Sequence, residues 1–189
     1  NNVLSDPRAR VILDDGRNYV RYTDQRYDLI TLEPLQMAQK GTVNFYTQDF
    51  YRAARRRMND DAVLCQWFPL YLTSLDDARR MAKTFVSVFP NSILWANTRD
   101  AVLIGFNTQS TDLQISENDI SRKLVLPSVY AELRQVGLVD LRTVWGGVLL
   151  DGEGLRAFSD SAEILTDDRP VMEFTAPRAR TTTLDEKTS

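Results

Sequence analysis

The acidic residue Glu33 stands where a buried strand gives way to a loop. Residues 27–32 form a short, nearly continuous apolar run, which is typical of a strand buried on both faces. In an open α/β sheet, ligands bind just beyond the carboxyl ends of the strands. Glu33 therefore occupies a position suited to binding or acid–base chemistry, although a carboxylate that simply caps a strand and faces water fits the same pattern.

The composition excludes several kinds of site. There is no histidine, and Cys65 is the single cysteine, so Ser-His-Asp and Cys-His catalysis, His-ligated zinc and an internal disulfide are excluded. Acid–base chemistry must then use carboxylates, tyrosine or lysine. We expect no metal site, and we interpret Cys65 as a buried strand residue without a redox role.

The charge pattern gives no sign of a nucleic-acid partner, because the formal net charge is -3. We interpret the arginines Arg52, Arg55 and Arg56 as the solvated face of an amphipathic helix. No apolar run approaches the length of a membrane span, and the first residues lack the pattern of a signal peptide.

Strand and helix signals alternate along the first part of the chain. We expect helices at 17–22, from Thr47 to 58 and from Ser74 to 89, and strands at 9–13, 27–32, 62–66, 92–96 and 101–106. The last two strands form a hairpin. This order predicts an α/β, partly doubly wound sheet with an antiparallel hairpin at one edge.

The character of the sequence changes after Asn107. We expect residues 1–107 to form the α/β portion, residues 108–178 a C-terminal helical extension with a final strand, and residues 179–189 a flexible tail. Within the extension, helices are predicted at 116–126 and 128–136, and the short strand at 171–174. The glycines at 146–147 and 152–154 indicate loops. By pattern alone, the chain is a ligand-binding α/β domain.

Several segments resemble the spermidine/spermine synthase family, and in particular a bacterial branch in which the domain is often joined to membrane or other modules. They occur in order along the chain: residues 6–19, 27–34, 44–51, 65–71, 166–170, 173–174 and 176–178. Their order and spacing carry the resemblance, because agreement across several motifs is stronger than any one of them.

The resemblance implies a class I methyltransferase-like fold and transfer of an aminopropyl group from decarboxylated S-adenosylmethionine to a diamine such as putrescine. The nucleoside is then a co-substrate, and no cofactor is tightly bound. Asp15 and Gly16 match the family's Asp-Gly pair, whose aspartate holds the adenine amino group, and a carboxylate can accept that hydrogen bond. A plain turn is the alternative interpretation of this pair.

Glu33 and Gln36 match the two aspartates of the family's Asp-x-x-Asp loop, of which the first helps to deprotonate the attacking amine. The chain departs from the pattern twice, because Glu is longer than Asp and Gln is neutral. A neutral amide cannot balance the second charge of a diamine. Gln66 matches a glutamine near the amine, and Trp67 and Tyr71 are candidates for an aromatic wall that attracts ammonium groups or, alternatively, for core packing.

The resemblance covers only the later part of the family's domain. The glycine-rich strand and loop, and the acidic residue that holds the ribose, have no counterpart before Asp6. In the family's sheet the missing strands lie between residues 9–13 and 27–32, so we expect a free apolar edge there. Such an edge pairs with a second copy, giving a homo-oligomer, or the chain rearranges to close the gap. We also expect the isolated chain to bind S-adenosyl compounds weakly and to be impaired in catalysis.

Three functions therefore stay open from the sequence. The first is an aminopropyltransferase-like enzyme of polyamine biosynthesis, with polyamine and nucleoside ligands. The second is a non-catalytic binding or interaction module on the same fold, and the third is a methyltransferase with another acceptor, since fold alone does not decide function. The resemblance implies a cytoplasmic location, or the cytoplasmic face of a membrane if a longer protein carries membrane segments.

Overall fold

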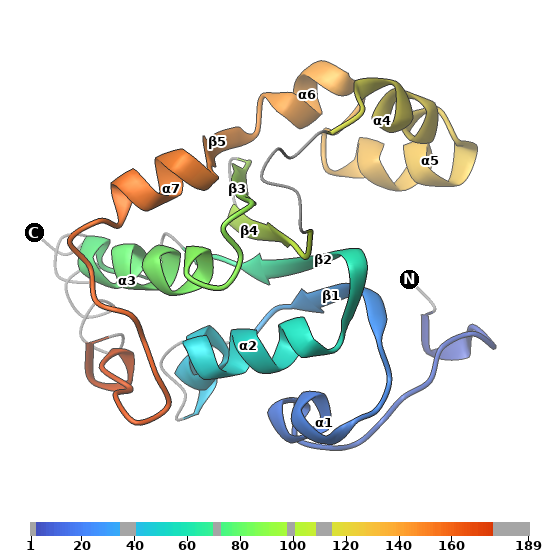
Figure 1. Cartoon of the computed structure of the whole chain (residues 1–189). Coiled ribbons are helices and arrows are strands. Elements are labelled where there is room, and N and C mark those ends of the chain that lie inside the picture. The colour runs from blue at the N-terminus through green and yellow to red at the C-terminus, as the bar shows by residue number, and fades with distance from the viewer. Residues whose placement is uncertain (1–2, 35–40, 70–72, 98–100, 109–114, 176–189) are drawn as a thin grey trace, which may run out of the picture.

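The computed structural model describes residues 3–34, 41–69, 73–97, 101–108 and 115–175. Within them, a mixed sheet of five strands runs in the order β1-β2-β4-β3-β5 (Figure 1). The strands are β1 (Tyr27–Leu32), β2 (Met58–Trp67), β3 (Ser92–Ala96), β4 (Ala101–Phe106) and β5 (Val148–Asp151). Strands β1 and β2 are parallel, and the other neighbouring pairs are antiparallel.

One face of this sheet is covered by two helices, α2 (Gln48–Arg56) and α3 (Leu75–Val86) (Figure 1). Their buried side chains pack with Leu64 of β2 and Leu103 of β4 in one core. Aromatic rings fill its centre, since the Phe85 ring lies 5.2 Å from those of Tyr51 and Phe89. The opposite face of β2 and β4 is only half-buried.

The predicted helix starts are confirmed by their caps. Thr47 precedes α2 and its hydroxyl accepts a hydrogen bond from the backbone N–H of Phe50 at 3.3 Å. Ser74 does the same for Asp77 at 3.1 Å, at the start of α3. Such caps satisfy N–H groups that have no partner inside the helix. The helix α1 (Gly16–Tyr22) and the short 3-10 helices η1 (Val3–Ser5) and η2 (Thr42–Tyr46) complete this half of the chain.

Two predicted strands are wrong. Residues 9–13 form no strand, and Val11 and Leu13 are 71% and 101% exposed. An extended segment becomes a strand only where a neighbouring segment shares its hydrogen bonds, and no segment among the described residues does so here. Residues 171–174 form a helical turn instead, with the N–H of Thr175 donating to the carbonyl of Val171 at 3.3 Å. This turn puts Met172, 1% exposed, into the core.

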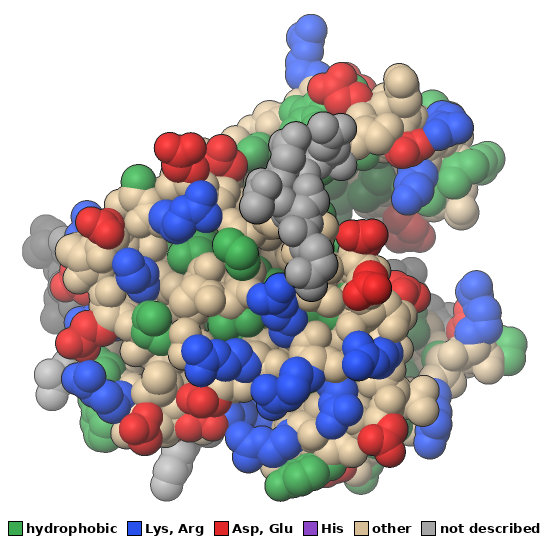
Figure 2. Space-filling view, in the orientation of Figure 1, with side chains coloured by type: hydrophobic (Ala, Val, Ile, Leu, Met, Phe, Trp, Pro, Cys, Tyr) green, Lys and Arg blue, Asp and Glu red, His purple; other side chains and the backbone are tan. Residues whose placement is uncertain are grey.

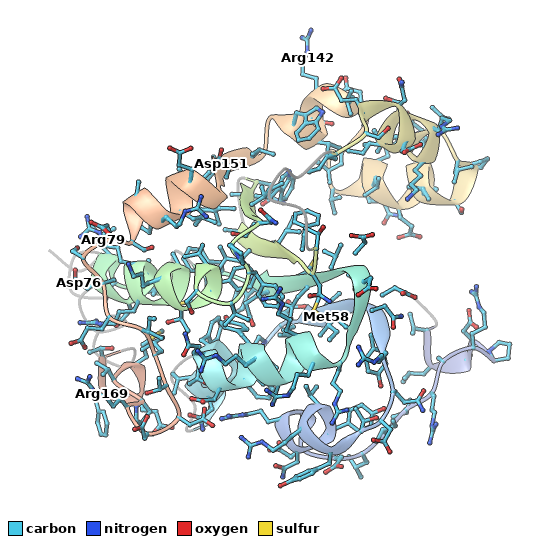
Figure 3. All side chains as sticks on the ribbon, viewed as in Figure 1. Met58, Asp76, Arg79, Arg142, Asp151 and Arg169 are labelled. Carbon is cyan, nitrogen blue, oxygen red and sulfur yellow. The ribbon has the colours of Figure 1, made fainter. Side chains whose placement is uncertain are left out.

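The hairpin of β3 and β4 forms as predicted, but β5 lies outside it and makes the edge of the sheet. The sequence predicted loops around β5 and α7 (Gly152–Phe158), where the side chain of Asp151 caps the helix by accepting from the N–H of Gly154 at 2.8 Å. Figure 3 shows Asp151 at this junction. Helix α7 packs against α3 and β3. The two helices predicted after Asn107 are present, as α4 (Glu117–Leu124) and α5 (Pro127–Gln135), followed by α6 (Leu141–Trp145).

The surface over α2 and α3 carries many basic side chains, Lys or Arg (Figure 2). Arg52 and Arg56 are exposed, as expected for a solvated helix face. Arg55 is half-buried and donates to the side chain of Asn107 at 3.0 Å and to the carbonyl of Val88 at 2.8 Å. Arg55 therefore joins α2 to the chain that follows α3 and β4. No helix in the described part of the chain is both long and apolar enough to cross a membrane.

Candidate functional site

Glu33 and Gln66 lie at the same end of the sheet, where the parallel strands β1 and β2 have their carboxyl ends. Leu32 pairs with Gln66 across the parallel strands, so Glu33 leaves β1 beside the end of β2. Glu33 is exposed, and Gln66 is fully buried.

Gln66 has an unused acceptor. Its Nε2 donates to the carbonyl of Trp67 at 3.3 Å, whereas its buried Oε1 has no hydrogen-bond partner in the described part of the chain. Tyr46 lies beside it and donates from its hydroxyl to the same carbonyl at 3.1 Å. Burial raises the pKa of Tyr46 well above its usual value, so this hydroxyl stays protonated and keeps donating. A buried amide oxygen without a partner is costly, and an N–H of a ligand would satisfy it.

Trp67 lies on the other face of the sheet from Gln66, because successive residues of a strand point to opposite sides. It is half-buried, as is Cys65, which shares its face. Burial raises the pKa of the Cys65 thiol, so the thiol stays protonated and unreactive near neutral pH. The structure therefore separates Trp67 from Gln66, which the sequence had grouped at one rim.

Asp15 and Gly16 stand at the start of α1. The Asp15 carboxylate is exposed and accepts a hydrogen bond from the N–H of Asn18 at 2.9 Å, which makes it the helix cap. One carboxylate has more lone pairs than this bond uses, so capping leaves room for a ligand. Gly16 lines a hollow of about 560 Å³, together with Leu32 and Phe45.

This hollow lies along the free side of β1, between that strand, α1 and the segment that contains Arg10 and Ile12. It is the gap in which the sequence placed the family's missing strands. Tyr19 and Tyr27 line it, and their hydroxyls are 2.7 Å apart. Their shared hydrogen bond is the main influence on both groups: it lowers the pKa of Tyr19 and raises the pKa of Tyr27. The pair ties α1 to the start of β1.

Asp167 holds the surroundings of the site together, a role that the sequence did not reveal. Its carboxylate accepts hydrogen bonds from Thr47 at 2.6 Å and from Arg17 at 2.7 Å, and its N–H donates to Asp49 at 2.9 Å. Partial burial acts to raise the pKa of Asp167, but the bonds from Thr47 and Arg17 and the nearby arginine charges outweigh it and lower the pKa.

This network links α1, α2 and the C-terminal segment, and a second link runs from the N–H of Gly41 to the Glu173 carboxylate at 3.0 Å. Both acidic residues fall in motifs that carried the family resemblance. The motifs were the available signal, but residues more than a hundred positions apart cannot be paired from one sequence.

Two of the predicted site residues, Gln36 and Tyr71, lie outside the described residues. Among the residues that are described, no group of three or more His, Cys, Asp or Glu side chains is arranged to hold a metal ion.

A sequence model of the spermine/spermidine synthase domain matches residues 1–118. The chain belongs to this family. The match contains β1, β2 and the hairpin of β3 and β4, and therefore the whole edge on which Glu33 and Gln66 lie. It ends before β5 and α7.

Two curated relatives are polyamine aminopropyltransferases. The protein from Nitrosomonas europaea is 30% identical over 156 residues, which cover 76% of this chain and 43% of the relative. Polyamine aminopropyltransferase 1 from Pseudomonas aeruginosa is 26% identical over 135 residues, which cover 71% of this chain and 46% of the relative. The chain thus spans about half the length of the curated relatives that it matches.

Solved structures of spermidine synthases share the fold. A spermidine synthase in complex with the transition-state analogue AdoDATO aligns with a TM-score of 0.59 at 13% identity, over 83% of this chain and 51% of that one. A probable spermidine synthase from Corynebacterium glutamicum aligns with a TM-score of 0.56 at 17% identity, over 86% and 55%. The open α/β sheet described above is therefore that of the class I methyltransferase-like spermidine synthases, as the sequence predicted.

Proposed function

We propose that the protein containing this chain transfers an aminopropyl group from decarboxylated S-adenosylmethionine to a diamine such as putrescine. Family membership supports the reaction class. One observation supports the position of the site: Glu33 leaves β1 beside the end of β2. At that end of β2, the buried Oε1 of Gln66 has no hydrogen-bond partner in the described part of the chain. Polyamines and a nucleoside are then the small-molecule partners, and a cytoplasmic location belongs to the same proposal.

The proposed step is a displacement at the carbon beside the sulfonium. The amine nitrogen forms a bond to this carbon as the carbon–sulfur bond breaks, and the bond electrons stay on sulfur, which leaves as neutral methylthioadenosine. A protonated amine has no free lone pair, so Glu33 accepts its proton before or during attack. Gln66 Oε1 accepts a remaining N–H and orients the lone pair.

The nucleoside roles in this proposal follow the family's motif. Asp15 accepts a hydrogen bond from the adenine amino group while it caps α1, and Gly16 lets the chain pass close to the base. Gln36 and Tyr71 keep the positions that the resemblance implies on the acceptor side. We assign an amine contact to Gln66 because its buried Oε1 has no hydrogen-bond partner in the described part of the chain.

The test is an assay of methylthioadenosine release with decarboxylated S-adenosylmethionine and putrescine, combined with calorimetry of putrescine binding. Glu33→Gln should lower the turnover rate by roughly 100-fold to 10,000-fold, the usual contribution of a general base. Glu132→Gln, an exposed carboxylate on α5, is the matched control and should leave turnover unchanged. Equal rates in Glu33→Gln and the parent would remove Glu33 from the mechanism.

A non-catalytic binding module is the second candidate, and one observation favours it. Gln36 is neutral where the family has an aspartate. This function predicts putrescine binding without any release of methylthioadenosine. Release of S-adenosylhomocysteine from ordinary S-adenosylmethionine, measured in a separate assay, distinguishes a methyltransferase from both.

We also propose that two copies pair through β1. In the described structure β1 has a neighbour on one side only, and Leu29 on this strand is 56% exposed. An unpaired apolar edge invites a second strand. Light scattering should give a dimer, and Leu29→Lys should shift it to a monomer. A parent protein that is monomeric at high micromolar concentration would contradict the pairing.

A further inference from the structure

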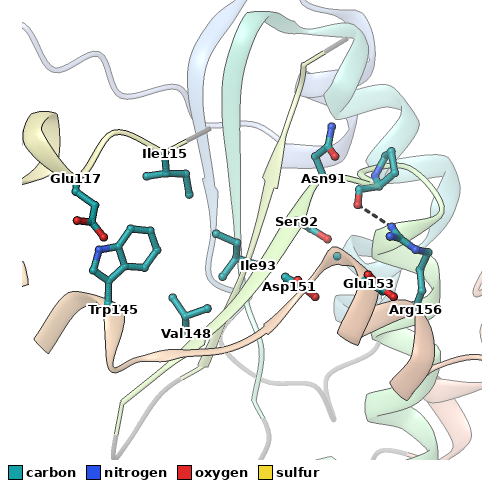
Figure 4. A pocket seen from close by; sticks show the side chains of 12 residues that line it. Asn91, Ser92, Ile93, Ile115, Glu117, Trp145, Val148, Asp151, Glu153 and Arg156 are labelled. Carbon is teal, nitrogen blue, oxygen red and sulfur yellow. Dashed lines mark hydrogen bonds between the residues drawn. The ribbon is translucent and has the colours of Figure 1, made fainter. Parts of the chain in front are cut away.

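A second hollow, of about 540 Å³, lies at the opposite edge of the sheet from Glu33 (Figure 4). Its walls come from the chain between α3 and β3, from β5 and α7, and from the residues around α4 and α6. None of its lining residues belongs to the proposed acceptor or nucleoside site.

Two buried polar atoms at this hollow lack partners. Ser92 lines it and is 2% exposed, and its Oγ has no hydrogen-bond partner in the described part of the chain. Trp145 lines it as well, and its buried Nε1 also lacks a partner there. A buried hydroxyl without a partner is costly, so Ser92 Oγ in this concave wall indicates a ligand that donates to it. The indole N–H needs an acceptor instead, such as a carboxylate.

The charged groups of the wall are mostly acidic. Glu117, Asp151 and Glu153 line the hollow, and none of them forms an ion pair within the described residues. Arg156 is the cation of the wall, and its Nη1 is held by the carbonyl of Pro90 at 3.0 Å. Three carboxylates against one guanidinium make this concave surface attractive to a cation.

The shape of the hollow separates these charges. In Figure 4, Glu117 and Trp145 lie at one end, whereas Asp151 and Glu153 lie at the other. The apolar side chains between them belong to Ile93 and Val148. An acidic group at each end with an apolar middle matches a chain of methylene groups that carries a cation at each end.

From this arrangement we propose that the hollow binds a linear aliphatic diamine or polyamine, at a site separate from the one at Glu33. One ammonium lies against the Trp145 ring and the Glu117 carboxylate, a pairing in which an aromatic face and a charge act together. That carboxylate also has lone pairs for the indole N–H. The methylene groups cover Ile93 and Val148, and the second ammonium donates to Asp151 and to Ser92 Oγ.

The indole N–H signals of the tryptophans offer a direct test by NMR. The chain has three tryptophans, of which Trp67 lies at the end of β2 and Trp145 lines the hollow. Titration with spermidine should move the Trp145 signal, assigned with Trp145→Phe. The signal should move equally in Glu33→Gln, because the proposed acceptor site is at the other edge.

The double variant Glu117→Gln and Glu153→Gln should weaken spermidine binding at this site by at least about tenfold, the value of one charge-assisted hydrogen bond. Both side chains are exposed, so the fold should be retained, and Glu132→Gln with Glu163→Gln is the matched control. n-Butylamine, with a single cation, should bind more weakly than putrescine. A Trp145 signal that does not move, or that moves equally in the double variant, would overturn the proposal.

Discussion

The two edges of the sheet carry hollows of similar size, about 560 Å³ at β1 and about 540 Å³ at β5, but they are built differently. The hollow at β1 is lined by residues that all come from one stretch of the chain, between Arg10 and Phe45. The hollow at β5 brings together the chain near Ser92, the start of α4 and the junction of β5 and α7.

This difference explains which site the sequence revealed. A strand that ends in an acidic residue is visible in a single segment, so Glu33 could be chosen directly. A hollow made by three distant segments has no local signal. The β5 edge was hidden because four residues of strand and seven of helix are too short to stand out by periodicity among the surrounding glycines.

The largest expected effect concerns the hydrophobic core that supports both edges of the sheet. Phe85→Ala should lower the free energy of unfolding by about 3–5 kcal/mol, because Phe85 is fully buried between Tyr51 and Phe89 at the centre of the core. Urea denaturation measures it, and Leu149→Ala, at a 55% exposed position of β5, is the control. Amine binding should weaken at both edges, and loss at one edge alone would show that the edges do not depend on a common core.

The next largest effect is a loss of stability that we expect from a glycine substitution beside β5 but not from one beside β1. A Cβ at Gly147 would lie 2.3 Å from the Trp95 ring and 2.8 Å from the carbonyl of Ala96, so Gly147→Ala should destabilise by roughly 1–3 kcal/mol and disturb β5. A Cβ at Gly16 meets the Phe45 ring at an ordinary 3.7 Å, so Gly16→Ala should fold normally. Thermal unfolding compares the two, and equal stability of both variants would contradict the contact geometry.

Asp167→Asn tests the support of the β1 edge. It removes the charge that binds Arg17 and Thr47, and we expect a loss of about 1 kcal/mol, since the group is a third exposed and solvent weakens its ion pairs.

The pH dependence has a definite sign for this substitution. The folded protein lowers the pKa of Asp167, so its contribution is complete above the usual value of 3.8 and is lost as the pH falls below it. The stability difference between the parent protein and Asp167→Asn should therefore shrink in acid. Denaturation curves at pH 7 and pH 3 measure this, and a difference that grows in acid would contradict the network.

The smallest expected effect is at the tyrosine pair. Tyr19→Phe removes the 2.7 Å hydroxyl contact with Tyr27 and should cost roughly 0.5–1 kcal/mol. Ultraviolet titration should then show the pKa of Tyr27 closer to its ordinary value, because the shared bond is what raises it. Tyr130→Phe, on the exposed surface of α5, is the control, and an unchanged Tyr27 titration would show that the pair is not coupled.

Much of the first hundred residues could be predicted because each element has a local cause. Thr47 and Ser74 cap their helices by bonds to residues three positions ahead. Residues 27–32 form the predicted strand, but it is not buried on both faces as we expected, since Asp28, Leu29 and Thr31 are exposed. Residues 9–13 look equally apolar but form no strand, since strand formation needs a partner that the segment itself does not supply. The division of the chain at residue 107 and the roles of the site residues remain predictions.

The sequence by itself determined the family, the strand that ends at Glu33, and the exclusion of histidine chemistry. These depend on residue types and on short-range spacing. Only the tertiary structure decided that Gln66 is buried with a free acceptor, that Trp67 faces away from it, and that β5 closes the far edge. Each of these depends on which side of the sheet a residue meets and on contacts between distant segments, and neither is encoded in any one stretch of the chain.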